Sequence, residues 1–131
     1  MKLSVVIPSV QDPYLEKTIE DIRGKFKGEY EIIVINGNGI GLRAAVNQGF
    51  AQAKGEYILK TDEHCKFDEG FDVKMLEKIE DNWIMVPRRY KLNLDTWECY
   101  DEEPVDYDKL IIDRSEKIGG MPWRRPSKKN I

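Results

Sequence analysis

Short apolar runs rich in β-branched residues alternate with longer stretches of helical spacing through the first ninety residues, and this alternation constrains the fold most. The runs are residues 3–7, 31–35, 57–59 and 83–86. After the first run, Asp12 is placed to cap a helix whose first turn contains Pro13. Each intervening stretch carries apolar or small residues on one side: Leu15, Ile19, Ile22 and Phe26, then Leu42, Ala45, Val46, Gly49 and Ala53, then Phe71, Met75, Leu76 and Ile79. The order β-α-β-α-β-α-β predicts a single α/β domain with an open, mostly parallel sheet and helices on both faces.

Strands joined through helices in this way pair in parallel with right-handed crossovers. The loops that follow the strands then gather at one edge of the sheet, where open α/β sheets bind their ligands. In this chain the loops are residues 9–12, 36–41 and 62–65. We therefore expect these three segments, although far apart in the sequence, to form a common binding site.

Composition narrows the class of protein. The chain has 131 residues, which is room for one domain with one core, and its formal net charge of -3 argues against a duplex nucleic-acid binder. It contains no apolar run long enough for a transmembrane helix, and the first run, bounded by Pro8 and Ser9, is typical of a strand rather than a signal peptide. Cys65 and Cys99 are not spaced as a zinc site, so we expect reduced thiols in a cytoplasmic protein.

Residues 62–64 combine the carboxylate of Asp62 with His64, the single histidine of the sequence. At a strand end, side chains two positions apart turn toward the same small volume. A carboxylate oxygen and a neutral imidazole nitrogen suit Mn²⁺ or a related transition ion better than Ca²⁺, which takes more oxygen ligands. Cys65 beside them is either a soft ligand or core filling. The other interpretation is a polar turn whose histidine forms only local hydrogen bonds.

Residues 36–41 contain three glycines before a predicted helix N-terminus, a pattern that permits close backbone approach to a phosphate. The spacing matches neither the dinucleotide-binding fingerprint nor the P-loop, so a flexible glycine loop is the alternative. Arg43 stands early in the following helix, where it is either an anion ligand or a solvated surface base.

Six segments in register resemble the nucleotide-sugar half of a family 2 glycosyltransferase with the GT-A fold, a Rossmann-like open sheet: residues 4–8, 15–19, 31–35, 41–49, 53–58 and 62–64. The resemblance covers about residues 1–90. It implies that Ser9 and Asn36 contact the nucleobase and that Arg43 meets the base or a phosphate. It also implies that Asp62 contacts the ribose and, together with His64, a divalent metal, Mn²⁺ or Mg²⁺. The family usually has Asp where Asn36 and His64 stand, and these departures bear on base selectivity and metal affinity.

The resemblance divides the chain into a nucleotide-sugar-binding part, residues 1–90, and a partial acceptor-side extension, residues 91–131. Charge separates into blocks within the extension, with -6 over residues 98–113 and +5 over residues 114–131. After Trp123 the basic tail has little to bury, so we expect it to be mobile without a partner.

The resemblance implies a metal-dependent, inverting transfer of a sugar from a nucleoside-diphosphate sugar, of UDP or GDP type, to an unknown hydroxyl acceptor by a truncated or minimal enzyme. A general base would deprotonate the acceptor. Asp101, Glu102 and Glu103 qualify by charge, although a solvated acidic loop explains them better, so the base is not assigned.

Three alternatives remain. The short acceptor side favours a non-catalytic nucleotide-sugar-binding module or the separated half of a larger transferase. A nucleotidyltransferase normally needs a Gly-rich, basic loop after the first strand, which residues 9–12 do not provide. The opposed charge blocks also allow a partner-binding protein or a homo-oligomer, whose association would depend on salt.

Overall fold

A computed structural model of the chain describes residues 2–105, 107–112 and 118–123. The chain divides into two compact units, residues 1–80 and 81–131. The two units meet at residue 80, whereas the sequence suggested a boundary at residue 90. The roles assigned to the two parts, donor binding and an acceptor-side extension, stay predictions. The basic tail, residues 124–131, lies outside the described residues.

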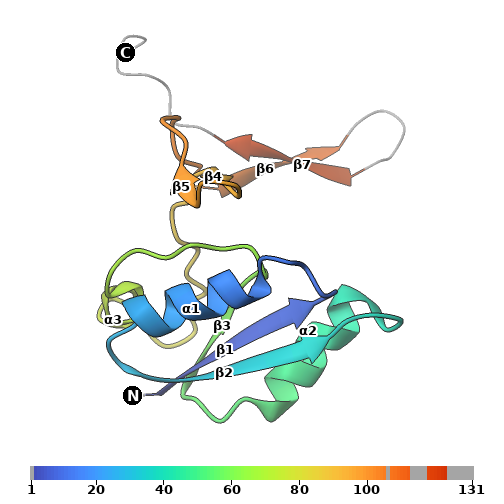
Figure 1. Ribbon diagram of the computed structural model, residues 1–131, viewed down its shortest axis with the longest axis vertical. Helices are drawn as coiled ribbons and strands as arrows, with labels where there is room; N and C mark the ends of the chain where they lie inside the picture. The colour runs from blue at the N-terminus through green and yellow to red at the C-terminus, as the bar shows by residue number, and fades with distance from the viewer. Residues whose placement is uncertain (1, 106, 113–117, 124–131) are drawn as a thin grey trace. The chain divides into compact units, whose positions relative to one another are not determined.

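The first unit contains six elements: β1 (Lys2–Ser9), α1 (Leu15–Lys25), β2 (Glu29–Asn36), α2 (Gly41–Gln52), β3 (Tyr57–Lys60) and α3 (Phe71–Leu76). The three strands form one parallel sheet in the order β2-β1-β3, and Figure 1 shows β1 and β2 side by side in the same direction. The predicted parallel α/β sheet is thereby confirmed. β1 is central because its apolar side chains suit burial on both faces.

Helices cover both faces of the sheet, as expected. On one face, β1 packs against α1 in a buried cluster of Leu3, Val5, Ile7, Ile19, Ile22, Phe26 and Phe67. On the other face α2 lies so close to β1 that a Cβ atom on Gly49 would collide with the side chain of Val6. The connection through α1 therefore runs on one side of the sheet and the connection through α2 on the other. Loops that leave a sheet in opposite directions open a crevice between them.

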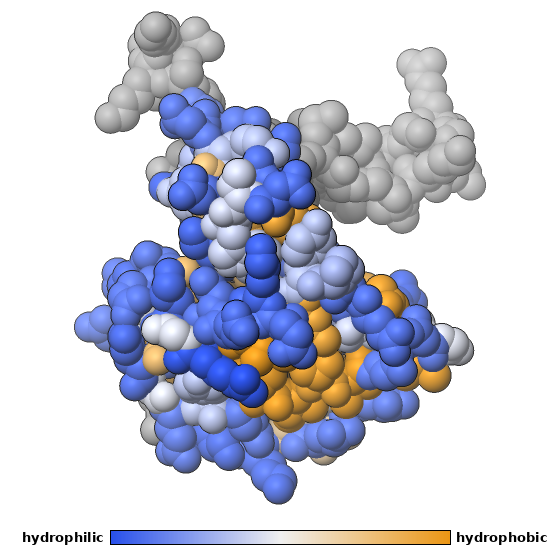
Figure 2. Space-filling view, in the orientation of Figure 1, coloured by the Kyte–Doolittle hydropathy of each residue, from blue (hydrophilic) through white to orange (hydrophobic). Residues whose placement is uncertain are grey.

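The face of the sheet that packs against α1 is covered only in part. Val34 of β2 is the register partner of Ile7 on β1, yet it is 40% exposed. Figure 2 shows an apolar area over β1 and β2 beside α1.

A polar network on the opposite face fixes the entry into β3. The fully buried Ser4 donates its hydroxyl hydrogen to Oε1 of Glu31 (2.6 Å) and accepts a hydrogen bond from the Gly55 backbone N–H (2.8 Å). Glu31 also accepts one from the Lys54 backbone N–H (2.8 Å). The Ser4 hydroxyl first, and then the Lys54 N–H, hold the pKa of the Glu31 carboxyl below its ordinary value. The network thus joins β1 and β2 to the turn before β3.

The prediction of a strand at residues 83–86 is wrong. No strand forms there, and Trp83, Ile84 and Val86 are exposed. A β-rich run becomes a strand only where a neighbouring strand and a covering layer accept it, and none of the strands of the described ranges pairs with this run.

The helix boundaries also differ from the predicted ones. The first helix begins at Leu15, because Oδ1 of Asp12 accepts a hydrogen bond from the Tyr14 N–H (2.8 Å) and so caps a turn before the helix. The third helix ends at Leu76 rather than reaching Ile79.

The second unit contains two antiparallel pairs: β4 (Leu92–Asn93) with β5 (Glu98–Cys99), and β6 (Tyr107–Ile112) with β7 (Ile118–Trp123). Oδ1 of Asn93 accepts hydrogen bonds from the backbone N–H groups of Asp95 (2.9 Å) and Thr96 (3.2 Å), which builds the turn between β4 and β5. Wherever side-chain burial is described, the buried hydrophobic residues all belong to the first unit.

Candidate functional site

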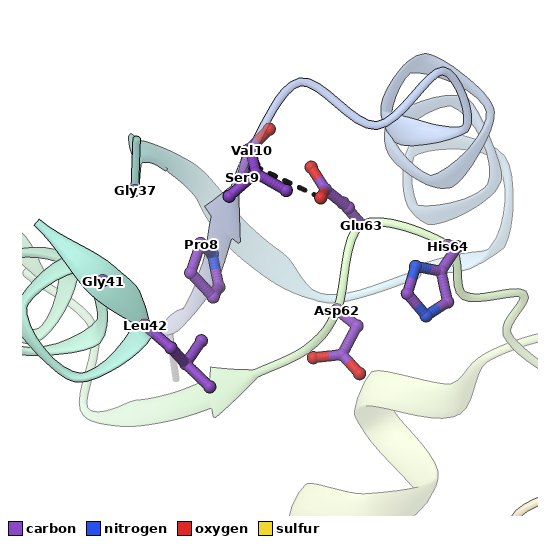
Figure 3. Close-up of a pocket in the computed structure, with 9 residues that line it drawn as sticks. All are labelled: Pro8, Ser9, Val10, Gly37, Gly41, Leu42, Asp62, Glu63 and His64. Atoms are coloured by element: carbon purple, nitrogen blue, oxygen red, sulfur yellow. Dashed lines mark hydrogen bonds between the residues drawn. The ribbon is translucent and has the colours of Figure 1, made fainter. Parts of the chain in front are cut away.

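The three loops at the carboxyl edge of the sheet meet, as the parallel topology predicted. They line a pocket of about 280 Å³ with Pro8, Ser9, Val10, Gly37, Gly41, Leu42, Asp62, Glu63 and His64, which Figure 3 displays. Gly37 N–H donates to the Ser9 carbonyl at 2.7 Å and so joins the first two loops. Gly39 and Gly41 have φ values of +80° and +82°, which glycine adopts without strain. The glycines of this loop therefore shape its backbone.

Glu63 joins the third loop to the first. Its side chain points toward Ser9 and Val10 in Figure 3, and the residue is only 6% exposed. Its carboxylate accepts hydrogen bonds from the backbone N–H groups of Val10 (3.2 Å) and Asp12 (3.3 Å). Bonds to a charged acceptor are the stronger kind, so this buried carboxylate fixes the backbone of the pocket wall.

Thr18 of α1 holds the same loop from the other side. The residue is fully buried, and its hydroxyl donates to the Glu63 carbonyl (3.0 Å) and accepts from the Cys65 N–H (3.0 Å). Thr18 thus satisfies two backbone groups of the loop, the buried carbonyl of Glu63 and the partly buried N–H of Cys65. Cys65 itself packs against the hydrophobic core, which supports its interpretation as core filling.

Asp62 and His64 lie on the side of the loop opposite to Glu63 (Figure 3). Their side chains are 53% and 47% exposed. Lys60 Nζ donates to Asp62 Oδ1 at 2.5 Å, and His64 Nδ1 lies 3.3 Å from Asp12 Oδ2. Figure 3 shows the two side chains on the same side of their loop, with Lys60 next to Asp62 and Asp12 next to His64. Their role as metal ligands stays a prediction.

Ser9 and Asn36 stand at the ends of β1 and β2, which the register pairs. Ser9 is buried, and its hydroxyl oxygen accepts a hydrogen bond from the Gln11 N–H (3.0 Å). Asn36 is exposed, and its Oδ1 accepts one from the Asn38 N–H (2.9 Å). Of these two residues, Ser9 lines the pocket, whereas the second loop contributes Gly37 to it.

Arg43 lines a neighbouring hollow rather than the pocket that contains Asp62. This hollow has a volume of about 320 Å³ and is lined by Leu42, Arg43, Val46, Asn47 and Lys60. Leu42 lines both cavities, and Lys60 pairs with Asp62. The two sites are thus adjacent, with positive charge gathered in the second.

The metal ligands predicted from the sequence are one carboxylate, Asp62, and one imidazole, His64. In the described part of the chain, no three His, Cys, Asp or Glu side chains come together as a metal-binding group. Mg²⁺ and Mn²⁺ are commonly bound through one or two protein ligands, with water and phosphate oxygens completing the shell. Asp62 and His64 fit a cation of that kind and do not fit one that needs a complete protein cage.

Two residues that support the pocket, Glu63 and Thr18, were not among the site residues predicted from the sequence. The signal for Glu63 was its place between Asp62 and His64, because alternation at a strand end turns it the opposite way. The signal for Thr18 was its spacing from Leu15 and Ile22, which puts a hydroxyl on the buried side of α1.

Comparison with known proteins gave one match. The model of the family described as glycosyl transferase family 2 matches residues 36–125, more than half of the chain. No curated protein and no solved structure matches the chain. None of the helices within the described ranges is long and apolar enough to span a membrane.

Proposed function

The chain belongs to glycosyl transferase family 2, and on this basis we propose that its pocket binds a nucleoside-diphosphate sugar through a divalent cation and supports inverting transfer of the sugar to a hydroxyl acceptor. The observation that carries the proposal is the meeting of three strand-end loops at one pocket. Asp62 and His64 project there on the same side of their loop.

The nucleobase is assigned to the region of Ser9 and Asn36. Oδ1 of Asn36 already accepts a hydrogen bond from a backbone N–H, so the amide NH₂ group is what this residue can offer a ligand. An amide NH₂ donates, whereas the Asp that is usual in the family accepts. The substitution therefore favours contact with a carbonyl oxygen of a base, which both uracil and guanine possess.

The diphosphate is assigned to the space between the two cavities. Arg43 and Lys60, two basic side chains, line the hollow next to the pocket. Arg43 can bind a phosphate through two parallel hydrogen bonds. Lys60 is paired with Asp62 and can exchange that partner for a phosphate oxygen.

Asp62 and His64 would hold the cation. When bound, the cation would neutralise the charge that develops on the diphosphate leaving group. Other residues of the chain hold and orient the reacting groups: Glu63 and Thr18 fix the loop that contains Asp62 and His64, and Arg43 orients the phosphates. Orientation of this kind matters because small displacements of reacting groups cost rate steeply.

The direct test is calorimetric titration of UDP and GDP into the full chain with and without Mn²⁺. Loss of a hydrogen bond to a charged group costs about 1–3 kcal/mol, so Asp62→Asn and His64→Ala should each weaken Mn²⁺-dependent binding by roughly five- to 150-fold. Asp68→Asn is the matched control, because Asp68 is an exposed carboxylate that pairs with Lys74. Binding that ignores Mn²⁺, or that both site variants leave unchanged, contradicts the proposal.

A second measurement separates transfer from binding alone. Release of UDP or GDP from a panel of nucleotide sugars, with water or simple sugars as acceptors, would support an enzyme. Tight metal-dependent binding with no release from any donor would support the binding-module alternative instead.

A further inference from the structure

Asp12 is held in one orientation by three contacts. Its Oδ1 accepts a hydrogen bond from the Tyr14 N–H at 2.8 Å, and its own backbone N–H donates to Oε2 of Glu63 at 3.3 Å. Its Oδ2 lies 3.3 Å from Nδ1 of His64. The Asp12 side chain is 21% exposed, so the carboxylate is mostly shielded from competing water. One oxygen thus serves the turn before α1, and the other faces the imidazole.

This arrangement selects one form of the neutral imidazole. An ionised carboxylate only accepts hydrogen bonds, so the nitrogen that faces it must carry the hydrogen. A neutral imidazole has one N–H, and a hydrogen on Nδ1 leaves the lone pair on Nε2. Histidines that bind metals commonly donate their second nitrogen to a carboxylate in this way.

We propose that Asp12 is a positioning residue that keeps neutral His64 in the Nδ1–H form and thereby presents Nε2 to the divalent cation. The inference rests on the proposed cation site and names the residue that prepares it. It also explains how a chain with His64 at this position can bind the cation with an oriented ligand, since the imidazole alone would be free to rotate and change tautomer.

The variant Asp12→Asn tests the inference with little change in shape. The amide oxygen can keep the hydrogen bond from the Tyr14 N–H, which leaves the NH₂ group toward His64. An NH₂ group donates, so it would demand an unprotonated Nδ1 and move the hydrogen to Nε2. In Asp12→Asn we therefore expect the imidazole hydrogen to move from Nδ1 to Nε2, and not only the loss of one hydrogen bond. Glu16→Gln is the matched control, because it removes one exposed carboxylate from the first turn of α1.

The first readout needs no metal. His64 is the only histidine in the chain, so long-range ¹H–¹⁵N correlation spectra of the imidazole report this one residue. In spectra of the neutral imidazole, the parent chain and Glu16→Gln should show a protonated Nδ1, and Asp12→Asn a protonated Nε2. A parent chain with hydrogen on Nε2, or the same tautomer in the parent and Asp12→Asn, would overturn the inference.

The second readout is Mn²⁺ affinity, measured with Mn²⁺ alone by water-proton relaxation. Loss of an outer carboxylate typically costs 10- to 100-fold in metal affinity, so Asp12→Asn should bind Mn²⁺ at least about tenfold more weakly, and Glu16→Gln as the parent does. Equal Mn²⁺ affinity in the parent and Asp12→Asn overturns this inference alone. A parent chain that binds no Mn²⁺ overturns the cation site of the proposed function, and the role of Asp12 toward a metal falls with it.

Discussion

Removal of the Thr18 hydroxyl tests whether the pocket depends on the packing of α1. In Thr18→Val the side chain keeps nearly the same shape, but the Glu63 carbonyl and the Cys65 N–H each lose a partner at 3.0 Å. A buried polar group left without a partner costs about 1–3 kcal/mol. Cys65 is only half-buried, which places its N–H at the lower end of that range. We therefore expect a loss of about 2–4 kcal/mol, a large share of the roughly 5–15 kcal/mol that stabilises a typical domain.

Thr18→Ser provides the matched control, because it keeps the hydroxyl and removes one buried methyl group, which costs about 1 kcal/mol. Urea denaturation of the three proteins gives the free energies of unfolding. The loop that Thr18 holds contains Asp62 and His64, so Thr18→Val should also weaken Mn²⁺-dependent nucleotide binding more than Thr18→Ser does. Equal stabilities for the two variants, or a Thr18→Val protein within about 0.5 kcal/mol of the parent, would refute the reasoning.

Three further changes have defined outcomes. Gly49→Ala should destabilise the folded chain by about 1–3 kcal/mol, because the added methyl group would collide with Val6. Gly24→Ala, whose methyl group would have no atom within 4 Å, should stabilise the chain by up to about 1 kcal/mol. Equal urea midpoints for the two variants would contradict the close packing of α2 against β1. The pKa of Glu31 is lowered in the folded chain, so its contribution to stability is complete above the unfolded-state value of about 4.3 and is lost as the pH falls through the lower folded-state value. Tm should therefore fall less steeply with decreasing pH in Glu31→Gln than in the control variant Glu20→Gln. Parallel plots of Tm against pH for the two variants would argue against the hydrogen bonds between Ser4 and Glu31. Lys60→Met should raise the affinity for Mn²⁺ alone by up to about fivefold, because it removes a competitor for Asp62 at an exposed pair; a lower affinity would mean that Lys60 assists the cation.

The alternation of residue types was sufficient to predict the three parallel strands of the sheet and the edge at which the pocket forms. β1 has the consecutive apolar residues Val5, Val6 and Ile7, so side chains on both of its faces must be buried. The helical stretches before and after residues 31–35 bury them. Parallel connections then require the loops after the strands to end at the same edge. The places of Ser9, Asp62 and His64 at the pocket follow from this connectivity without any knowledge of side-chain contacts.

The tertiary structure decided everything that depends on which side chains meet across about fifty residues of chain. Glu63 contacts Val10, Thr18 contacts Cys65 and Asp12 contacts His64, and sequence spacing indicates at most which way these side chains face, not which partner they meet. Arg43 lies in the neighbouring hollow, and residues 83–86 stay out of the sheet despite their β-rich composition. Propensity and periodicity report local preference and the buried side of an element, whereas hydrogen-bond partners and strand neighbours are set by how the elements pack against one another.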